Sequence, residues 1–199
     1  MSVADSYFEQ LFNNSDDPWA FKQRWYERRK RALTLAALPA PHYPVIFEPG
    51  CANGELSAEL ALRCDRLVCC DTSKVAVELA RQRLHAFDHV QVLQGRLPKE
   101  WPEGRFDLIV FSELGYYLDA ADLQIWITRA RESLTDNGQL LACHWRPHIE
   151  GCPLDAEQVH QALQEQLQWP RLFTHHEPDF LLDLWSRDDQ SVAQREHLR

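Results

Sequence analysis

Short apolar runs alternate with amphipathic stretches along most of the chain, from Pro44 to Ser186. The first five apolar runs are too short for helices and comprise residues 45–48, 67–71, 90–93, 106–111 and 139–144. Between them, apolar residues recur with the three-to-four-residue spacing of a helix in residues 55–63, 73–85 and 121–134. This alternation predicts an α/β fold, in which helices connect the strands and cover the sheet.

The rhythm changes after the fifth run. Residues 155–167 have helical spacing, and two further apolar runs, 171–177 and 180–186, are separated only by Pro178 and Asp179. A parallel pair of strands needs a crossover of a dozen or more residues, so these two strands must be antiparallel. We therefore expect a seven-stranded mixed sheet that ends in an antiparallel hairpin.

A helical segment precedes the sheet. Asp17 is a good N-cap and Pro18 a good first helical residue, which predicts a helix over residues 18–38. The chain is about the length of one domain, with a helical segment over residues 1–43, a sheet core over 44–187 and a polar tail over 188–199. Because the helical segment carries aromatic and basic residues, we expect it to cover the functional site.

Composition narrows the choice of partners. The 21 Lys and Arg against 30 Asp and Glu give a net charge of −9, which disfavours nucleic acid. No apolar run approaches the roughly 20 residues of a membrane span, and the N-terminus does not resemble a signal peptide, so we expect a cytoplasmic protein without membrane contact. Its six cysteines form no C-x-x-C motif, so we expect reduced thiols and no metal site.

A glycine-bearing loop follows the first predicted strand. Gly50 and Gly54 allow the backbone to approach a ligand, and the next helix offers free N–H donors. Asp71, at the end of the second strand, is placed to accept both hydroxyls of a ribose. The dinucleotide fingerprint would need glycine where Ala52 stands, and the Glu48 carboxylate would oppose a pyrophosphate. The loop therefore favours a positively charged nucleotide cofactor.

The loop resembles the E/D-x-G-x-G-x-G motif of class I methyltransferases, with Ala52 in place of the middle glycine. A wider resemblance, to the nodulation protein S family, rests on residues 17–19, 25–31, 34–39, 48–51 and 112–118. It implies a Rossmann-like class I fold and N-methylation with S-adenosylmethionine, giving S-adenosylhomocysteine. The implied acceptor is a small molecule, the free amine of a terminal glucosamine on a deacetylated chitooligosaccharide.

The methyltransferase fold assigns cofactor contacts to residues around the loop and the strand ends. We expect Tyr26 and Arg28 to hold the methionine carboxylate, and Arg96 and Leu97 to flank the adenine. The full expected cofactor set is Tyr26, Arg28, Glu48, Gly50, Cys51, Ala52, Gly54, Asp71, Thr72, Arg96, Leu97 and Ser112.

Two residues are candidates for proton handling. Glu113, after the fourth strand, could orient an ammonium group and act as general base, and His144, at the end of the fifth strand, is the second candidate. The expected acceptor site comprises Glu113 and four aromatic residues, Trp19, Tyr116, Tyr117 and Trp145. The sequence leaves open an oxygen acceptor, a non-sugar amine, and a module that binds S-adenosylmethionine without catalysis.

Overall fold

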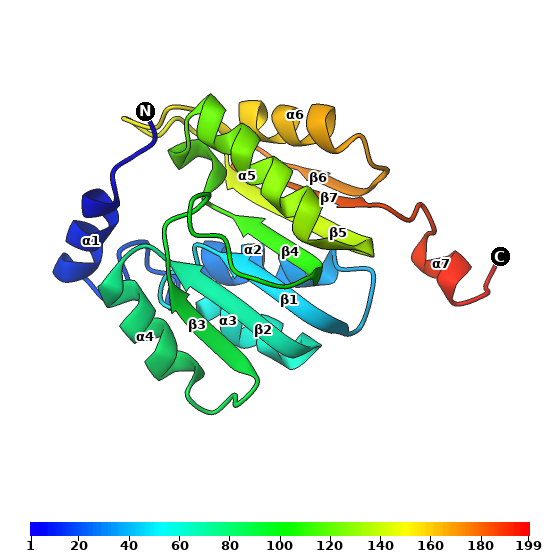
Figure 1. Ribbon diagram of the computed structural model, residues 1–199, viewed down its shortest axis with the longest axis horizontal. Coiled ribbons are helices and arrows are strands. Elements are labelled where there is room, and N and C mark those ends of the chain that lie inside the picture. The colour runs from blue at the N-terminus through cyan, green and yellow to red at the C-terminus, as the bar shows by residue number, and fades with distance from the viewer.

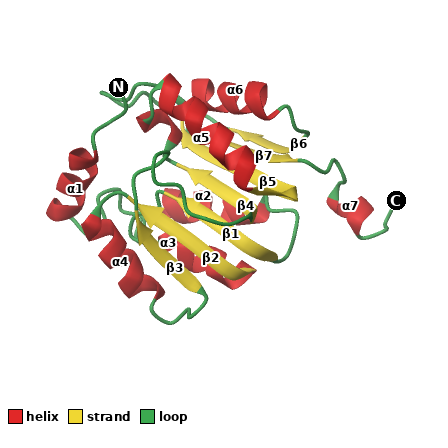
Figure 2. Cartoon of the chain, in the orientation of Figure 1, coloured by secondary structure: helices red, strands yellow, loops and turns green.

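A computed structural model describes residues 1–199 as a seven-stranded sheet with the strand order β3-β2-β1-β4-β5-β7-β6 (Figures 1 and 2). The strands are β1 (Tyr43–Pro49), β2 (Cys64–Asp71), β3 (Val90–Gln94), β4 (Phe106–Ser112), β5 (Leu134–Trp145), β6 (Arg171–His176) and β7 (Phe180–Ser186). The first five pair in parallel, whereas β7 is antiparallel to both β5 and β6. The predicted mixed sheet and its closing hairpin are confirmed.

Helices cover both faces of the sheet because its central strands are apolar on both sides. One face packs against α2 (Trp25–Ala36), α3 (Glu55–Leu60) and α4 (Lys74–Leu84), with the short 3-10 helix η1 (Ala61–Arg63) after α3. The other packs against α5 (Ala120–Ser133) and α6 (Ala156–Leu167), which Figure 1 shows together over the β5 side. None of these helices has the length and apolar composition needed to cross a membrane.

The N-terminal segment folds differently from the predicted single helix over residues 18–38. A first helix, α1 (Asp5–Asn14), is followed by turns, and α2 begins only at Trp25. The Asp17 carboxylate accepts hydrogen bonds from the N–H groups of Phe21 and Lys22, at 2.8 and 3.0 Å, so it closes a local turn. Ala20, with φ 58°, then takes the chain out of helical geometry.

The C-terminal residues are more ordered than the expected polar tail. Ser191 and Gln194 form a capping box, and a short helix, α7 (Val192–Arg195), lies beyond the end of the sheet. Figure 2 places this helix at the opposite side of the molecule from α1, so the tail does not reach the strand ends where ligands bind in such folds.

Candidate active site

A cavity of about 520 Å³ lies at the carboxyl ends of β1, β2 and β4. The loops after these strands form its floor, and α1, the turn around Trp19 and the start of α2 close it from above. The N-terminal segment is anchored on both sides, because the Val3 N–H donates to the Tyr117 carbonyl and the Ser73 hydroxyl donates to Glu9. The expectation that residues before the first strand cover the site agrees with this arrangement.

The glycine-bearing loop turns sharply beneath the cavity. Gly50, Ala52 and Gly54 all have positive φ, at 71°, 49° and 82°. A Cβ atom on Gly54 would lie 3.2 Å from the Ala80 backbone, so this position needs glycine for close packing against α4. Gly50 and Ala52 line the cavity, whereas Cys51 and Gly54 do not.

Asp71 ends β2 at one side of the cavity and is 9% exposed. Its carboxylate accepts from the N–H groups of Ala52 and Ser73, at 2.9 and 3.0 Å, one on each oxygen. Burial raises the pKa of Asp71, and these backbone donors oppose the rise. A carboxylate has about four acceptor positions, so two remain for a ligand with two hydroxyl groups.

Glu48 was expected to contact the cofactor, but it does not line the cavity. Its side chain is buried under the loop beside Ser57 and Cys69, and its Oε2 atom has no hydrogen-bond partner. Burial raises the pKa of Glu48 to about 8. The expectation that a Glu48 carboxylate acts directly on the cofactor is therefore wrong. The loop separates this group from the cavity, and at neutral pH the group is mostly protonated.

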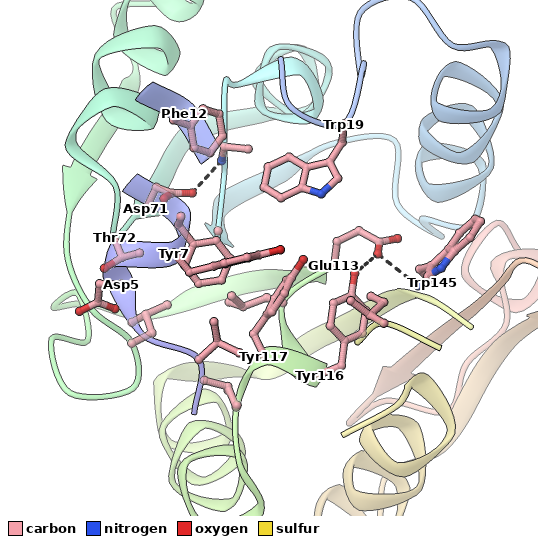
Figure 3. A pocket seen from close by; sticks show the side chains of 18 of the residues that line it. Asp5, Tyr7, Phe12, Trp19, Asp71, Thr72, Glu113, Tyr116, Tyr117 and Trp145 are labelled. Carbon is pink, nitrogen blue, oxygen red and sulfur yellow. Dashed lines mark hydrogen bonds between the residues drawn. The ribbon is translucent and has the colours of Figure 1, made fainter. Parts of the chain in front are cut away.

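Glu113 reaches into the other side of the cavity, as Figure 3 shows. It takes a left-handed backbone conformation, with φ 55°, just after the end of β4. Its Oε2 atom accepts from the Tyr116 hydroxyl and from the Trp145 N–H, and its Oε1 atom accepts from the Lys30 ammonium at 2.9 Å. Oε1 therefore keeps one free acceptor position. Ser112, which precedes it, does not line the cavity.

The helix α2 contributes different residues from those expected. Tyr26 lines the cavity and its buried hydroxyl has no partner, but Arg28 is exposed and stacks on Trp25, so its expected cofactor contact is wrong. Lys30 points inward instead and pairs with both Glu113 and Glu27. Sequence reasoning missed Glu27 and Lys30, although with Tyr26 they follow the one-face spacing of a helix.

His144 is not at the cavity and cannot act as the base there. It is fully buried, and burial holds its pKa well below the usual range. The Gly115 N–H donates to its Nε2 atom at 3.0 Å, so its Nδ1 atom carries the proton and donates to Nε2 of His160 at 3.0 Å. His160 in turn donates to Asp183 at 2.6 Å. This chain of donors ends inside the sheet, so the catalytic expectation for His144 is wrong.

The aromatic residues expected at the site, Trp19, Tyr116, Tyr117 and Trp145, all line the cavity. So do Thr72, Arg96 and Leu97, on the β2 and β3 side. Tyr7, Phe8 and Phe12 of α1, which were not expected from the sequence, complete the wall. The i, i+4 spacing of Phe8 and Phe12 is the signal that could have revealed their shared helix face.

Comparison with known proteins defines the class. A family model described as a methyltransferase domain matches residues 47–140, which include the glycine loop, Asp71 and Glu113. The N-methyltransferase NodS from Bradyrhizobium japonicum WM9, solved in complex with S-adenosylhomocysteine, superposes with a TM-score of 0.83 at 25% identity, over 91% of this chain and 96% of that one. The protein is a class I methyltransferase.

Sequence relatives define the family within this class. Nodulation protein S of Rhizobium tropici is 30% identical over 179 residues, which cover 84% of this chain and 73% of the relative. Nodulation protein S of Sinorhizobium fredii is also 30% identical, over 77% and 73% of the two chains. The chain belongs to the nodulation protein S family, as predicted.

A more similar solved structure agrees with this assignment. A Pseudomonas syringae protein provisionally assigned as a methyltransferase is 68% identical, with a TM-score of 0.76 over 82% of this chain and 100% of that one. The comparisons confirm the predicted fold, family and methyltransferase class. The complex of NodS with S-adenosylhomocysteine agrees with the predicted cofactor.

Proposed function

We propose that this protein transfers a methyl group from S-adenosylmethionine to the nitrogen of a small amine, and that its acceptor is an amino sugar. The observation that carries the proposal is the placement of two carboxylates at opposite ends of one cavity, the buried Asp71 after β2 and the half-buried Glu113 after β4 (Figure 3). The first suits a ribose, and the second suits an amine.

The charge of the cavity wall fits a cationic methyl donor. Six carboxylates line the cavity, against three basic side chains. A sulfonium ion is favoured in such a field, whereas a pyrophosphate is disfavoured. The volume of about 520 Å³ lies within the usual range for cofactor and ligand pockets.

Different residues around the cavity would contact the ribose, the adenine and the methionine part of the cofactor. Asp71 would hold the ribose hydroxyls with its two free acceptor positions. Leu97 and Thr72 would flank the adenine, since both line the wall beyond Asp71. The unpartnered Tyr26 hydroxyl and Arg24, which lines the same wall, would hold the methionine carboxylate. In this arrangement Arg24 takes the role expected for Arg28.

Bound S-adenosylmethionine supplies an activated methyl group, so most of the rate must come from alignment of the amine. Glu113 accepts an N–H of the amine at its free Oε1 position, which directs the nitrogen lone pair into the cavity. As the nitrogen–carbon bond forms and the carbon–sulfur bond breaks, the nitrogen loses a proton to Oε1. Tyr116 and Trp145 hold the other oxygen and fix the plane of the carboxylate.

Aromatic rings support a sugar as the carrier of the amine. Tyr7 and Trp19 line the space between Asp71 and Glu113, and Trp145 lies beside Glu113 on its far side (Figure 3). Flat rings of this kind pack well against the apolar faces of pyranose rings. The resemblance to the nodulation protein S family points to the same class, an amino group on a deacetylated chitooligosaccharide.

A panel of matched acceptors tests the proposal. Purified protein is incubated with S-adenosylmethionine and glucosamine, deacetylated chitobiose, their N-acetylated forms or glucose, and S-adenosylhomocysteine is measured. We expect product only with the free amines, and a mass spectrum that places the methyl group on nitrogen. Equal transfer to the N-acetylated sugars or to glucose would contradict an amine acceptor. Cofactor binding without transfer to any acceptor would favour a non-catalytic role.

A further inference from the structure

Three charged side chains form a row in the wall of the cavity. The Lys30 ammonium lies 2.9 Å from Oε1 of Glu113 and 3.1 Å from Oε2 of Glu27. The exposed fractions of these side chains are 7% for Lys30, 9% for Glu27 and 20% for Glu113. All three residues line the cavity, and Glu113 is the most exposed of them.

The row has one negative charge more than it has positive charge. A single buried pair of Lys30 and Glu113 would be neutral, and the second carboxylate, on Glu27, removes that balance. An unbalanced buried charge is unfavourable unless a further positive charge neutralises it. A proton or a cationic acceptor can provide that charge, and Glu113 is the more exposed of the two carboxylates that could receive it.

We propose that Lys30 and Glu27 are positioning residues that set, in opposite directions, how readily Glu113 takes up the proton of the methyl acceptor. Lys30 stabilises the Glu113 carboxylate and opposes proton uptake. Glu27 partly neutralises Lys30 and favours proton uptake. This inference rests on the proposed function, because the proton in question is the one that the amine nitrogen loses on methylation.

The proton balance of the step is simple. The nitrogen–carbon bond forms, the carbon–sulfur bond breaks with its electron pair going to sulfur, and the N–H bond gives its proton to Glu113. The row is then neutral overall, and Glu113 returns the proton to water when product leaves. No oxidant, reductant or metal ion is needed.

Few other charges act on Glu113. The titratable groups that interact with it come from α2, η2 (Gly115–Tyr117) and β5, and they are Tyr26, Glu27, Lys30, Tyr116, Tyr117 and Cys143. Burial raises the pKa of the three tyrosines and raises that of Cys143 to about 12, so these groups stay neutral at ordinary pH. Glu27 and Lys30 are left as the charged neighbours.

The test uses the pH profile of kcat at saturating cofactor and amine. In the proposed mechanism the base must be free to accept the amine proton, so we expect the profile to have an acid limb. Lys30→Met should move this limb to higher pH by about one unit or more, the usual effect of removing an opposite charge. Glu27→Gln should move it to lower pH and reduce the plateau rate. Lys30→Arg should keep the wild-type limb.

The controls distinguish an effect of charge on the pH profile from a loss of folding in the variants. Lys74→Met, on an exposed residue of α4, should leave the profile unchanged. Lys30→Met leaves two carboxylates unbalanced and is at risk of misfolding, whereas Glu27→Gln leaves a neutral buried pair and should fold. The predicted shift of the acid limb to lower pH in Glu27→Gln therefore tests the inference even if Lys30→Met does not fold. Loss of rate in both variants with an unmoved limb, or shifts in the same direction, would overturn it.

A second measurement does not depend on turnover. The 13C NMR signal of the Glu113 carboxyl carbon, assigned with Glu113→Gln, is titrated in wild type and in both variants without acceptor. Opposite shifts of the titration midpoint support the coupling, and equal midpoints refute it. If the midpoints shift but no amine is methylated by wild type, the coupling stands and the proposed function fails. If amines are methylated but the limbs do not move, the positioning role fails and the function stands.

Discussion

The buried carboxyl of Glu48 gives the chain a calculable dependence of stability on pH. In the native state burial raises the pKa of Glu48 to about 8, against an ordinary value of 4.5. Between these two pH values the native state holds the proton and the unfolded chain does not. The free energy of unfolding therefore decreases as pH rises from about 4.5 to about 8, and this contribution is constant at higher pH.

The magnitude follows from the size of the shift. Each pKa unit corresponds to about 1.4 kcal/mol, so the full effect is on the order of 5 kcal/mol, and about 3 kcal/mol of stability is lost by pH 7. This is a large share of the 5–15 kcal/mol typical of a native domain. Glu48→Gln keeps the shape of the side chain and cannot ionise, so the variant should not lose this stability.

The assay is urea unfolding of wild type and Glu48→Gln at one-unit steps from pH 5 to pH 9, with reductant to protect the free thiols. The difference in unfolding free energy should grow in favour of the variant by roughly 1 kcal/mol per unit up to about pH 8. Glu132→Gln, on the exposed side of α5, should show a constant difference. A constant difference for Glu48→Gln as well would refute the assignment of a buried, protonated carboxyl.

Three further predictions test the site and its supports. Asp71→Ala should weaken S-adenosylmethionine binding by roughly 1.5–3 kcal/mol in calorimetry, and unchanged affinity in a folded variant would contradict the ribose contact. Gly115→Ala should lower the free energy of unfolding by about 1–3 kcal/mol and lower kcat, because its Cβ would lie 2.5 Å from Val159 and 2.9 Å from His144. A variant with the stability and kcat of wild type would contradict this. Removal of residues 1–14 should weaken S-adenosylmethionine binding in calorimetry, because Tyr7, Phe8 and Phe12 form part of the cavity wall, and unchanged affinity in a folded variant would mean that α1 does not close the cavity over the cofactor.

The sheet and the two ends of the cavity were predictable because they depend on local patterns. Apolar runs of four to seven residues fix the strands, and the two-residue Pro178-Asp179 connection fixes the antiparallel hairpin. In a parallel sheet the carboxyl ends meet at one edge, so Asp71 and Glu113 had to approach each other once their strands were placed. The structure puts both on the same cavity.

The N-terminal segment was less predictable because competing local interactions decide it. Asp17 has two uses, to begin a helix or to close a turn, and the structure shows the second. The shift of the helix start to Trp25 changes which basic residues face inward. Lys30 enters the cavity wall, and Arg28 stays outside. The sequence shows six basic residues on this segment, but only Arg24 and Lys30 of them line the cavity, and the helix start and phase that select these two depend on tertiary packing.

The sequence offers Glu113 and His144 as alternative candidates for proton handling, and the structure places them in different surroundings at the ends of β4 and β5. Glu113 is the first residue beyond β4, and its left-handed backbone directs the carboxylate out of the sheet and into the cavity. His144 lies within β5, where the sheet covers it on one side and α6 on the other. Its proton is committed to His160, and its free nitrogen is occupied by the Gly115 N–H. That bond fixes the turn that carries Tyr116 to Glu113, so in the proposed mechanism His144 contributes only by holding Tyr116, the hydrogen-bond partner of the Glu113 carboxylate, in place.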